Sequence, residues 1–383
     1  MQYPGHLSSK LPRVGTTIFT EMSALAQKHN AVNLSQGFPD FDPHPKLIEA
    51  VAHAMKSGHN QYAPMGGWMP LRERIAEQIE QRYGTAFHPD QEITITAGAT
   101  QALCTAMAAT ITEGDEVILF TPAYDAYAPL VELFGGTPVY VKLQFPDYHI
   151  DWDQLQHMIS HKTKMIVMNN PHNPTGAVLK SEDLDRLERI VKNSNILLLA
   201  DEVYEHIIFD GLKHQSLLSR SALAERTIAV YSFGKTFHMT GWKLGYAVAP
   251  ENLMKEFRKV HQFNVFSVNR PAQVGLAEFL TDGSQWEVGQ MYAQKRDEFL
   301  NLVSSSRFKS LPTHGSYFVL MDYSAVSDES DMEYAKRLTI EKGLASIPVS
   351  VFYNVPTDHK VLRFCFAKNS ETLEKGAEIL NSL

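Results

Sequence analysis

Short apolar segments alternate along this chain with longer amphipathic ones, and this alternation constrains the fold more than any other feature. Several of the segments are apolar at every position rather than at alternate positions, as in the stretch from Ile196 to Ala200. Such a strand is buried on both faces, which happens when helices cover both sides of a parallel sheet. The segments predicted as strands are 93–96, 116–120, 137–141, 165–169, 195–200, 227–231 and 244–249.

Helical patterns occupy the chain between these strands. The segment 99–111 is rich in alanine, and the segment 181–193 opens with Ser181, Glu182 and Asp183, residues that favour a helix N-terminus. A strand, helix, strand order predicts a mostly parallel sheet with helices on both faces. We therefore expect an α/β protein built on a seven-stranded sheet.

The length of 383 residues suggests two domains, and the pattern changes near residue 283. After this point we predict helices over 286–304, 331–342 and 370–381, a strand over 361–366, and an apolar segment over 315–320. This mixture is typical of a smaller α+β domain. We expect the large domain to span 33–282 and the small domain to combine 1–32 with 283–383.

Composition excludes several classes of partner. The net charge is −8, so the basic surface that nucleic acid or an anionic membrane requires is absent. Two cysteines, and no apolar run of membrane-spanning length, favour a cytoplasmic protein. His157 and His161 lie four residues apart on a predicted helix over 153–162, but no third ligand is apparent, so no metal site is predicted.

Polar residues follow the carboxyl ends of the predicted strands, where open parallel sheets bind ligands. Small residues from Ala97 to Ala99 open a helix after the first strand, a typical place to bind an anion. The other residues at this edge are Tyr124, Asn173, Asp201, Tyr204, Ser232, Lys235 and Lys243. An aromatic face, an amide, a carboxylate, hydroxyls and lysines together suit a planar cofactor that carries a basic nitrogen, a phenolic oxygen, an aldehyde and a phosphate. Pyridoxal phosphate has these groups.

Four segments carry a family resemblance: 35–41 (Ser-Gln-Gly-Phe-Pro-Asp-Phe), 170–176, 200–204 and 232–246. Through them the chain resembles the class I, fold-type I pyridoxal-phosphate aminotransferases. It is most similar to the subgroup of kynurenine aminotransferases, glutamine transaminase K and methionine aminotransferases. The resemblance implies a homodimer whose active site is shared between the subunits.

The resemblance also implies roles around the cofactor. Lys235 would be the Schiff-base lysine, Asp201 would pair with the pyridine nitrogen, and Asn173 and Tyr204 would donate to the 3′ oxygen. Tyr124 would stack on the ring. The phosphate site would comprise Ala99, Thr100 or its neighbour Gln101, Ser232 and Lys243, with Tyr62 contributed by the partner subunit. Two positions depart from the family pattern, since many relatives carry Arg at the position of Lys243 and a hydroxyl residue at Gly234.

The resemblance also implies which residues bind the substrate. Arg363 matches the arginine that grips the α-carboxylate, and Gly37 and Asn173 would complete this grip. The residues that match the side-chain pocket are Phe19, Tyr62, Phe266 and Phe352. Such walls suit methionine, phenylalanine, tyrosine and related neutral amino acids, with a 2-oxo acid as acceptor. No motif supplies a second arginine for a distal carboxylate. The sequence alone does not exclude Arg270 from this role.

Three other interpretations compete with this one. A cysteine-conjugate C–S β-lyase would share the fold and cofactor. Tyr231 and Lys235 also form the Tyr-x-x-x-Lys pair of short-chain dehydrogenases, but the glycine-rich dinucleotide loop is missing near the N-terminus. Regulators that reuse this fold carry a DNA-binding module, and this chain has no basic N-terminal module.

Overall fold

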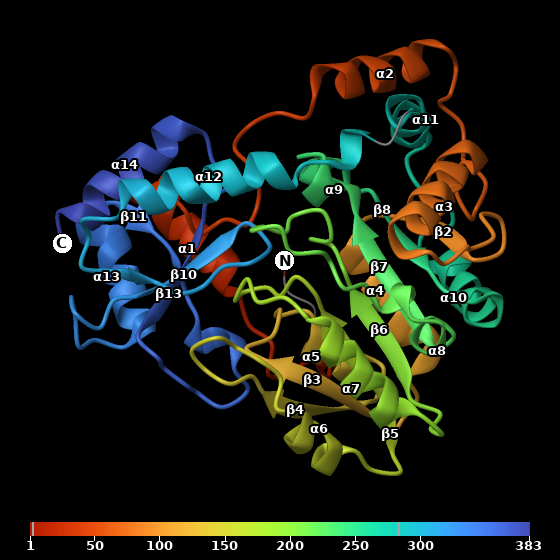
Figure 1. The fold of residues 1–383 in the computed structure, drawn as a ribbon, viewed down its shortest axis with the longest axis horizontal. Helices are drawn as coiled ribbons and strands as arrows, with labels where there is room; N and C mark the ends of the chain where they lie inside the picture. Colours follow the sequence, from red (N-terminus) through yellow and green to blue (C-terminus); the bar gives the residue numbers. More distant parts are fainter. Residues whose placement is uncertain (2–3, 282–283) are drawn as a thin grey trace.

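A seven-stranded sheet forms the centre of the computed structural model, which describes residues 1, 4–281 and 284–383 (Figure 1). Its strand order is β2-β8-β7-β6-β5-β3-β4, and the pairs are parallel except where β8 meets β2 and β7. The strands are β2 (Ile93–Thr96), β3 (Glu116–Thr121), β4 (Thr137–Lys142), β5 (Thr163–Asn169), β6 (Leu197–Asp201), β7 (Thr227–Ser232) and β8 (Gly245–Val248). All seven predicted strands are confirmed, as is the α/β class.

Each face of this sheet packs into a separate apolar core. Ile118 and Ile166 belong to one core, whereas Val117, Leu119 and Val167 belong to the other. Because successive side chains of a strand point to opposite faces, a strand that serves two cores must be apolar at every position. This explains the continuous apolar runs of the sequence. The helices packed around the sheet are α4 (Ala99–Thr110), α5 (Tyr127–Leu133), α6 (Trp152–Met158), α7 (Ser181–Val191), α8 (Ser221–Ala224) and α10 (Glu251–Asn264).

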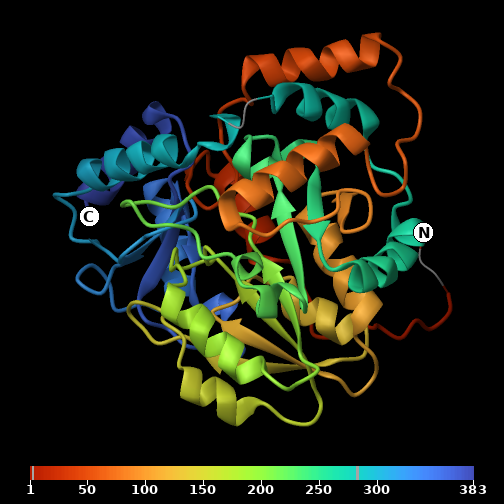
Figure 2. The same ribbon diagram turned by 45° about the vertical axis from the view of Figure 1, so that its right-hand side comes forward.

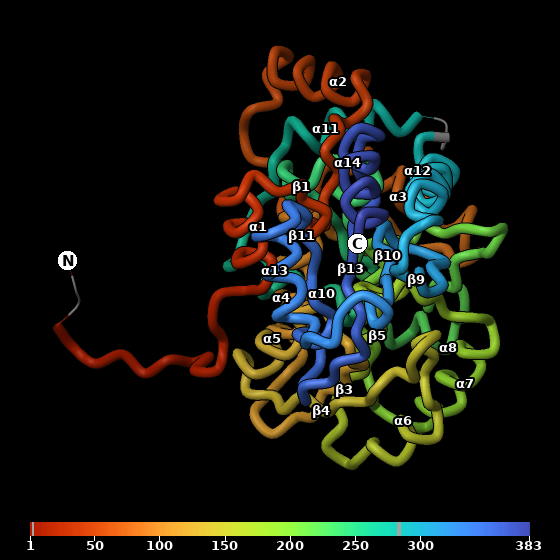
Figure 3. Tube along the Cα trace, turned by 90° about the vertical axis from the view of Figure 1, so that its left-hand side faces the viewer, coloured from red at the N-terminus to blue at the C-terminus, as the bar shows by residue number. Residues whose placement is uncertain are grey.

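A second, four-stranded antiparallel sheet lies on the other side of the molecule, with the order β12-β13-β10-β9 (Figures 1 and 3). Its strands are β9 (Lys309–Ser310), β10 (Phe318–Asp322), β12 (Ile347–Pro348) and β13 (Val361–Cys365). The helices beside it are α1 (Ile18–Lys28), α12 (Gly289–Leu302), α13 (Asp331–Lys342) and α14 (Ser370–Asn381). The predicted helices over 331–342 and 370–381 are confirmed.

A short parallel pair connects the beginning of the chain with its C-terminal part. It joins β1 (Val32–Asn33) to β11 (Leu344–Ala345). The two larger sheets use separate stretches of chain. Helix α1 packs with the second of them, near α13 and β11. The domain limits at residues 33 and 283 stay predictions.

Two predicted helices have different bounds in the structure. The helix expected over 286–304 begins only at Gly289, after a 3-10 turn at Ser284–Trp286. Trp286 is buried against the ring of Phe237, and docking this side chain turns the backbone before the helix starts. The helix expected over 153–162 ends at Met158, because Ile159 is extended. His161 therefore lies outside the helix, and its predicted spacing from His157 on one helical face is wrong.

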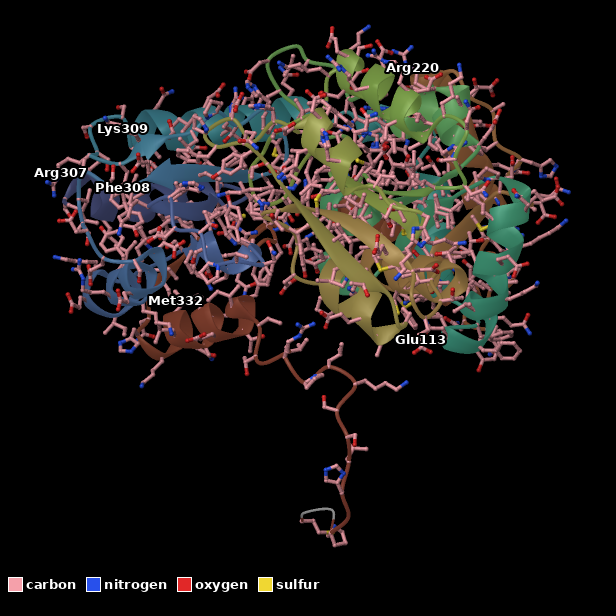
Figure 4. All side chains as sticks on the ribbon, turned by 90° about the horizontal axis from the view of Figure 1, so that it is seen from below. Glu113, Arg220, Arg307, Phe308, Lys309 and Met332 are labelled. Atoms are coloured by element: carbon pink, nitrogen blue, oxygen red, sulfur yellow. The ribbon has the colours of Figure 1, made fainter. Side chains whose placement is uncertain are left out.

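The helices α2 (Pro45–Lys56), α3 (Met69–Tyr83) and α11 (Arg270–Phe279) complete the part of the molecule around the large sheet, together with the short α9 (Phe233–Thr236). Figure 2 shows α2 and α11 side by side at the top of the molecule. Before α1, the described chain from Pro4 onward forms an extended arm that stands away from the body, as Figures 3 and 4 show, and Leu7 on this arm is exposed.

None of the helices in the described ranges combines the length and the apolar character that a membrane crossing requires.

We predict that Gly275→Ala destabilises the protein. An added Cβ would lie 2.7 Å from the backbone nitrogen of Val51, so α2 and α11 would have to separate. Overpacking of this kind costs about 1–3 kcal/mol. Thermal unfolding should show a lower midpoint for this variant, whereas Gly15→Ala, where nothing lies within 4 Å, should unfold like the wild type. Equal midpoints for both variants would contradict the close approach.

Candidate active site

A cavity of about 260 Å³ lies at the carboxyl ends of the central strands. Its wall combines the ends of β5, β6 and β7 and the start of α4 with residues of the second sheet. The predicted site residues in this wall are Phe19, Gly37, Ala99, Thr100, Tyr124, Asn173, Asp201, Tyr204, Ser232, Lys235, Lys243 and Arg363. The structure thus brings together residues that are up to several hundred positions apart in the chain.

Lys235 projects from α9, which follows β7 directly. Its Nζ donates hydrogen bonds to the carbonyl oxygen of Gly37 at 3.1 Å and to the hydroxyl of Tyr317 at 2.9 Å. Burial lowers the pKa of Lys235 to about 8, and the nearby cations Arg363 and Lys243 act in the same direction. A larger fraction of this amine is therefore neutral at pH 7 than of an exposed lysine, which makes it a better nucleophile and base.

Asp201 is the last residue of β6, and its side chain is almost fully buried. One carboxylate oxygen accepts a hydrogen bond from the Tyr127 hydroxyl at 2.5 Å, and the other accepts one from the Val203 amide at 3.4 Å. Burial nevertheless raises the pKa of Asp201 to about 6. A carboxylate buried beside a cavity in this way is well suited to a protonated ring nitrogen, which would offset the loss of solvation.

The start of α4 forms the anion-binding end of the cavity. Gly98, with φ at +78°, turns the chain into the helix, so the first amides of α4 face the cavity at Ala99 and Thr100. Lys243 lies against the same turn, because a Cβ added at Gly98 would lie 3.4 Å from the Lys243 Nζ. Ser232 lies in the same wall. Helix amides, a hydroxyl and an ammonium group are the donors that a phosphate prefers.

Gln101, the predicted alternative to Thr100 in the phosphate site, does not lie in this wall. Its side-chain oxygen accepts a hydrogen bond from the Ala97 amide at 3.0 Å, and its nitrogen bonds to the Thr105 hydroxyl at 2.5 Å. The side chain therefore runs along α4 and satisfies groups of the helix itself. Of the two candidates, Thr100 is the one at the cavity.

Arg363 lies on β13, is 1% exposed, and packs its guanidinium 3.9 Å from the centre of the Phe318 ring. It donates hydrogen bonds to the side-chain oxygen of Asn173 at 2.8 Å and to the carbonyl oxygen of Ser35 at 3.1 Å. No carboxylate of the described residues lies within ion-pair distance of it. Burial lowers the pKa of Arg363 to about 10, which still leaves it charged at neutral pH. A buried cation without an anionic partner is suited to an anionic ligand.

Three predicted pocket residues lie outside the cavity wall of this chain. Phe352 is buried behind Arg363, with its ring centre 5.6 Å from the guanidinium and 5.9 Å from the ring of Phe19. Tyr62 and Phe266 instead form an exposed pair, with ring centres 5.3 Å apart. Their roles in the site stay predictions, and for Tyr62 and Phe266 they depend on a second subunit.

The Tyr-x-x-x-Lys pair of a dehydrogenase is not formed. The hydroxyl of Tyr231 donates to the carboxylate of Glu202 at 3.0 Å, and its ring stacks on that of Tyr246 at 4.6 Å. Tyr231 is fully buried and is not among the residues of the cavity that contains Lys235.

Three residues that contact the predicted site residues were not expected from the sequence. They are Tyr127, which donates to Asp201, Tyr317, which contacts Lys235, and Phe318, which supports Arg363. Tyr127 could have been suspected, since it lies three residues after Tyr124 in the segment that follows β3. Tyr317 and Phe318 gave no signal that separates them from ordinary core aromatics.

The known proteins that this chain resembles are aminotransferases. Residues 29–380 match the family of class I and II aminotransferases. The chain is 49% identical to the methionine aminotransferase of Escherichia coli over 98% of each chain, and 34% identical to human kynurenine–oxoglutarate transaminase 1 over 94% of each. A solved Escherichia coli structure, described as having a methionine aminotransferase function, superposes with a TM-score of 0.97 and covers 99% of this chain and 100% of its own.

The chain belongs to the class I and II aminotransferase family. Its fold is the fold-type I architecture of that family, and its activity is that of a transaminase. The relatives described above are aminotransferases, so neither the C–S β-lyase nor the dehydrogenase alternative has support.

The residues present fit pyridoxal phosphate, the cofactor of this family. The buried Asp201 carboxylate has a raised pKa that a ring N–H would relieve, and Lys235 has the lowered pKa that a carbonyl-binding amine needs. The Gly98 turn keeps the space beside Lys243 free of a side chain, where a phosphate would lie. Lys243 in place of the arginine of many relatives keeps the charge and loses only the planar fork.

We predict that Asp201→Asn stabilises the cofactor-free protein at neutral pH but not in acid. Because the folded pKa of about 6 lies above the ordinary value of 3.8, Asp201 contributes its full stability below pH 4 and loses this contribution as the pH rises through 6. The loss amounts to about 3 kcal/mol. Thermal melts from pH 4 to 7 should show the two proteins diverging with rising pH. A difference that does not vary with pH would contradict the raised pKa.

Proposed function

We propose that this protein transfers the amino group of methionine, and of aromatic and other bulky neutral L-amino acids, to a 2-oxo acid, with pyridoxal phosphate as cofactor. The observation that carries the proposal is the buried Arg363, which has no acidic partner among the described residues and shares one cavity with Lys235. An arginine in this position suits the α-carboxylate of an amino acid. Lys235 then lies where the proton on the α-carbon must move.

The residues divide the work as follows. Pyridoxal phosphate, when bound, supplies an aldehyde that combines with amino groups and a ring that accepts the electron pair left when the α-proton departs. Asp201 would hold the ring nitrogen protonated, and Asn173 and Tyr204 would donate to the phenolic oxygen. The phosphate would be held by the α4 amides at Ala99 and Thr100, by Ser232 and by Lys243.

Lys235 would act as the acid and base of the reaction. As a neutral amine it can take the proton from the α-carbon of the substrate, and as an ammonium it can return a proton. Its pKa of about 8 lies close enough to neutral pH for both forms to be available. Arg363 would fix the carboxylate, and Asn173 would hold the guanidinium in place through their 2.8 Å hydrogen bond.

The cavity favours a neutral substrate side chain. The basic residues in its wall are Lys235, Lys243 and Arg363, and each already has a role in the reaction, the phosphate site or the α-carboxylate site. Arg270 lies outside this wall and packs on the ring of Trp68 at 4.8 Å. Within this chain, no cation is left for a distal carboxylate, whereas Phe19, Phe38 and Tyr124 offer apolar surface. The names of the Escherichia coli and human relatives point to the same class of substrates.

We also propose a homodimer with a shared site, in the cytoplasm. Tyr62, Phe263 and Phe266 are large, exposed and apolar, as expected of a surface that a second copy covers. A partner would then contribute its Tyr62 to the phosphate and its Phe266 to the substrate pocket. Cys104 and Cys365 are both free thiols, which supports a reducing compartment.

The substrate proposal predicts that methionine and phenylalanine exceed aspartate in kcat/KM. A distal carboxylate would be buried without a partner, so we expect a difference on the order of 100-fold. Initial rates with a common 2-oxo acid would measure it, with Lys235→Ala as the inactive control. A higher kcat/KM for aspartate would refute the substrate class, and turnover by Lys235→Ala at the wild-type rate would refute the mechanism.

The role of Arg363 predicts that Arg363→Lys weakens all amino acid substrates alike. Lysine keeps the charge but cannot form the two parallel bonds of a guanidinium, so kcat/KM should fall by roughly 10- to 100-fold. The ratio between methionine and phenylalanine should stay unchanged, because the side-chain pocket is untouched. A change in that ratio without a general loss would show that Arg363 contacts the side chain instead.

A further inference from the structure

Tyr317 is a buried polar residue that contacts Lys235 from behind the cavity wall, and the proposed mechanism gives it no task. It precedes β10 and is 0% exposed. Its hydroxyl lies 2.6 Å from the carbonyl oxygen of Gly37 and 2.9 Å from the Nζ of Lys235. Lys235 also donates to Gly37, at 3.1 Å. The three groups therefore form a closed triangle of hydrogen bonds.

The protons in this triangle can be assigned from the chemistry of its members. A carbonyl oxygen only accepts, so the single proton of the Tyr317 hydroxyl is used in the bond to Gly37. The hydroxyl then presents a lone pair to Lys235 and acts as an acceptor. A neutral amine has two N–H bonds and one lone pair. Gly37 and Tyr317 accept its two N–H bonds, and its lone pair is used by neither of them.

We propose that Tyr317 is a positioning residue for Lys235: together with the Gly37 carbonyl, it holds both N–H bonds of the free amine and leaves the lone pair free to take a proton. The inference rests on the proposed function, in which Lys235 moves the α-proton. The same arrangement serves the return step, because an ammonium keeps its two held N–H bonds and has a third to donate.

The acceptor has to stay neutral for this arrangement to work. Burial raises the pKa of Tyr317 well above its usual value, and the neighbouring Tyr204 acts in the same direction, so the group remains a phenol. A phenolate or carboxylate at this place would form an ion pair with Lys235 and raise the pKa of the lysine. The charged and titratable groups around Lys235 are otherwise Asp201, Lys243, Arg363 and Cys365.

Tyr317 is itself held firmly on both sides. Its carbonyl accepts a hydrogen bond from the Phe366 amide at 3.0 Å, and the amide of Ser316 donates to Ile207 at 2.9 Å. Its ring meets that of Tyr204 edge-on, with centres 5.0 Å apart. A side chain fixed in this way can hold a flexible lysine in one orientation, which is what proton transfer to and from a single carbon requires.

The test compares Tyr317→Phe with the matched control Tyr292→Phe. Tyr292 lies on α12, is equally buried, and has its ring 5.7 Å from that of Tyr317, but its hydroxyl has no hydrogen-bond partner in the described part of the chain. Tyr317→Phe should lower kcat for methionine by roughly 10- to 100-fold with KM nearly unchanged, since misplacement of the amine slows only the chemical step. The deuterium isotope effect for α-deuterated methionine should rise. Tyr292→Phe should leave all three values unchanged.

A second readout does not need the cofactor or turnover. The pKa of Lys235 in the cofactor-free protein can be measured by labelling with acetic anhydride at a series of pH values and quantifying the peptide that contains Lys235. Tyr317→Phe should lower this pKa, because the ammonium form loses an acceptor. Tyr292→Phe should match the wild type.

The outcomes separate the inference from the proposed function. Wild-type kcat, isotope effect and Lys235 pKa in Tyr317→Phe would overturn the inference, and so would equal losses in both variants, which would indicate general packing damage. A lowered Lys235 pKa in Tyr317→Phe alone, in a wild-type protein that fails to transaminate methionine, would support the contact and count against the proposed function.

Discussion

Burial of the central sheet on both faces is the constraint on which the rest of the structure depends. A strand that packs into two cores has few positions for a polar side chain along its length, so most polar groups are placed where the strand ends. Asn169, Asp201 and Ser232 are the last residues of β5, β6 and β7. The fold therefore gathers its reactive groups at one edge, where the second sheet adds Arg363 and closes the cavity.

Basic residues outnumber acidic ones in the cavity wall, although the protein as a whole is acidic. The chain carries a net charge of −8, yet the cavity wall contains Lys235, Lys243 and Arg363 against the single carboxylate of Asp201. Desolvation lowers the pKa of Lys235 and Arg363 and raises that of Asp201, so each group is held in a state that a ligand of opposite charge would relieve. The phosphate and the α-carboxylate of the proposed ligands would each bring a negative charge, and their binding would restore the balance.

The sequence predicts the strands well because double burial leaves continuous apolar runs, and it predicts the residues at their ends for the same reason. The sequence alone could not distinguish adjacent residues whose side chains point in different directions. Glu202 directly follows Asp201, yet its carboxylate bonds to His214 and Tyr231 away from the cavity. Gln101 and Thr100 differ by one step around α4. The family resemblance, and not the pattern, singled out Asp201, whereas Tyr317 had neither a pattern nor a family role to mark it.

The backbone from Ser35 to Gly37 contacts both Arg363 and Lys235. The Ser35 carbonyl accepts from Arg363, and the Gly37 carbonyl accepts from Lys235 and Tyr317. Ser35 is fully buried, and a Cβ on Gly37 would lie 2.9 Å from the ring of Phe318, so this segment has little freedom to move alone. A shift that improved the grip on the α-carboxylate would therefore also move the acceptor of the lysine. Because Arg363 and Lys235 both donate to this segment, the proposed substrate binding and proton transfer would depend on the same three residues.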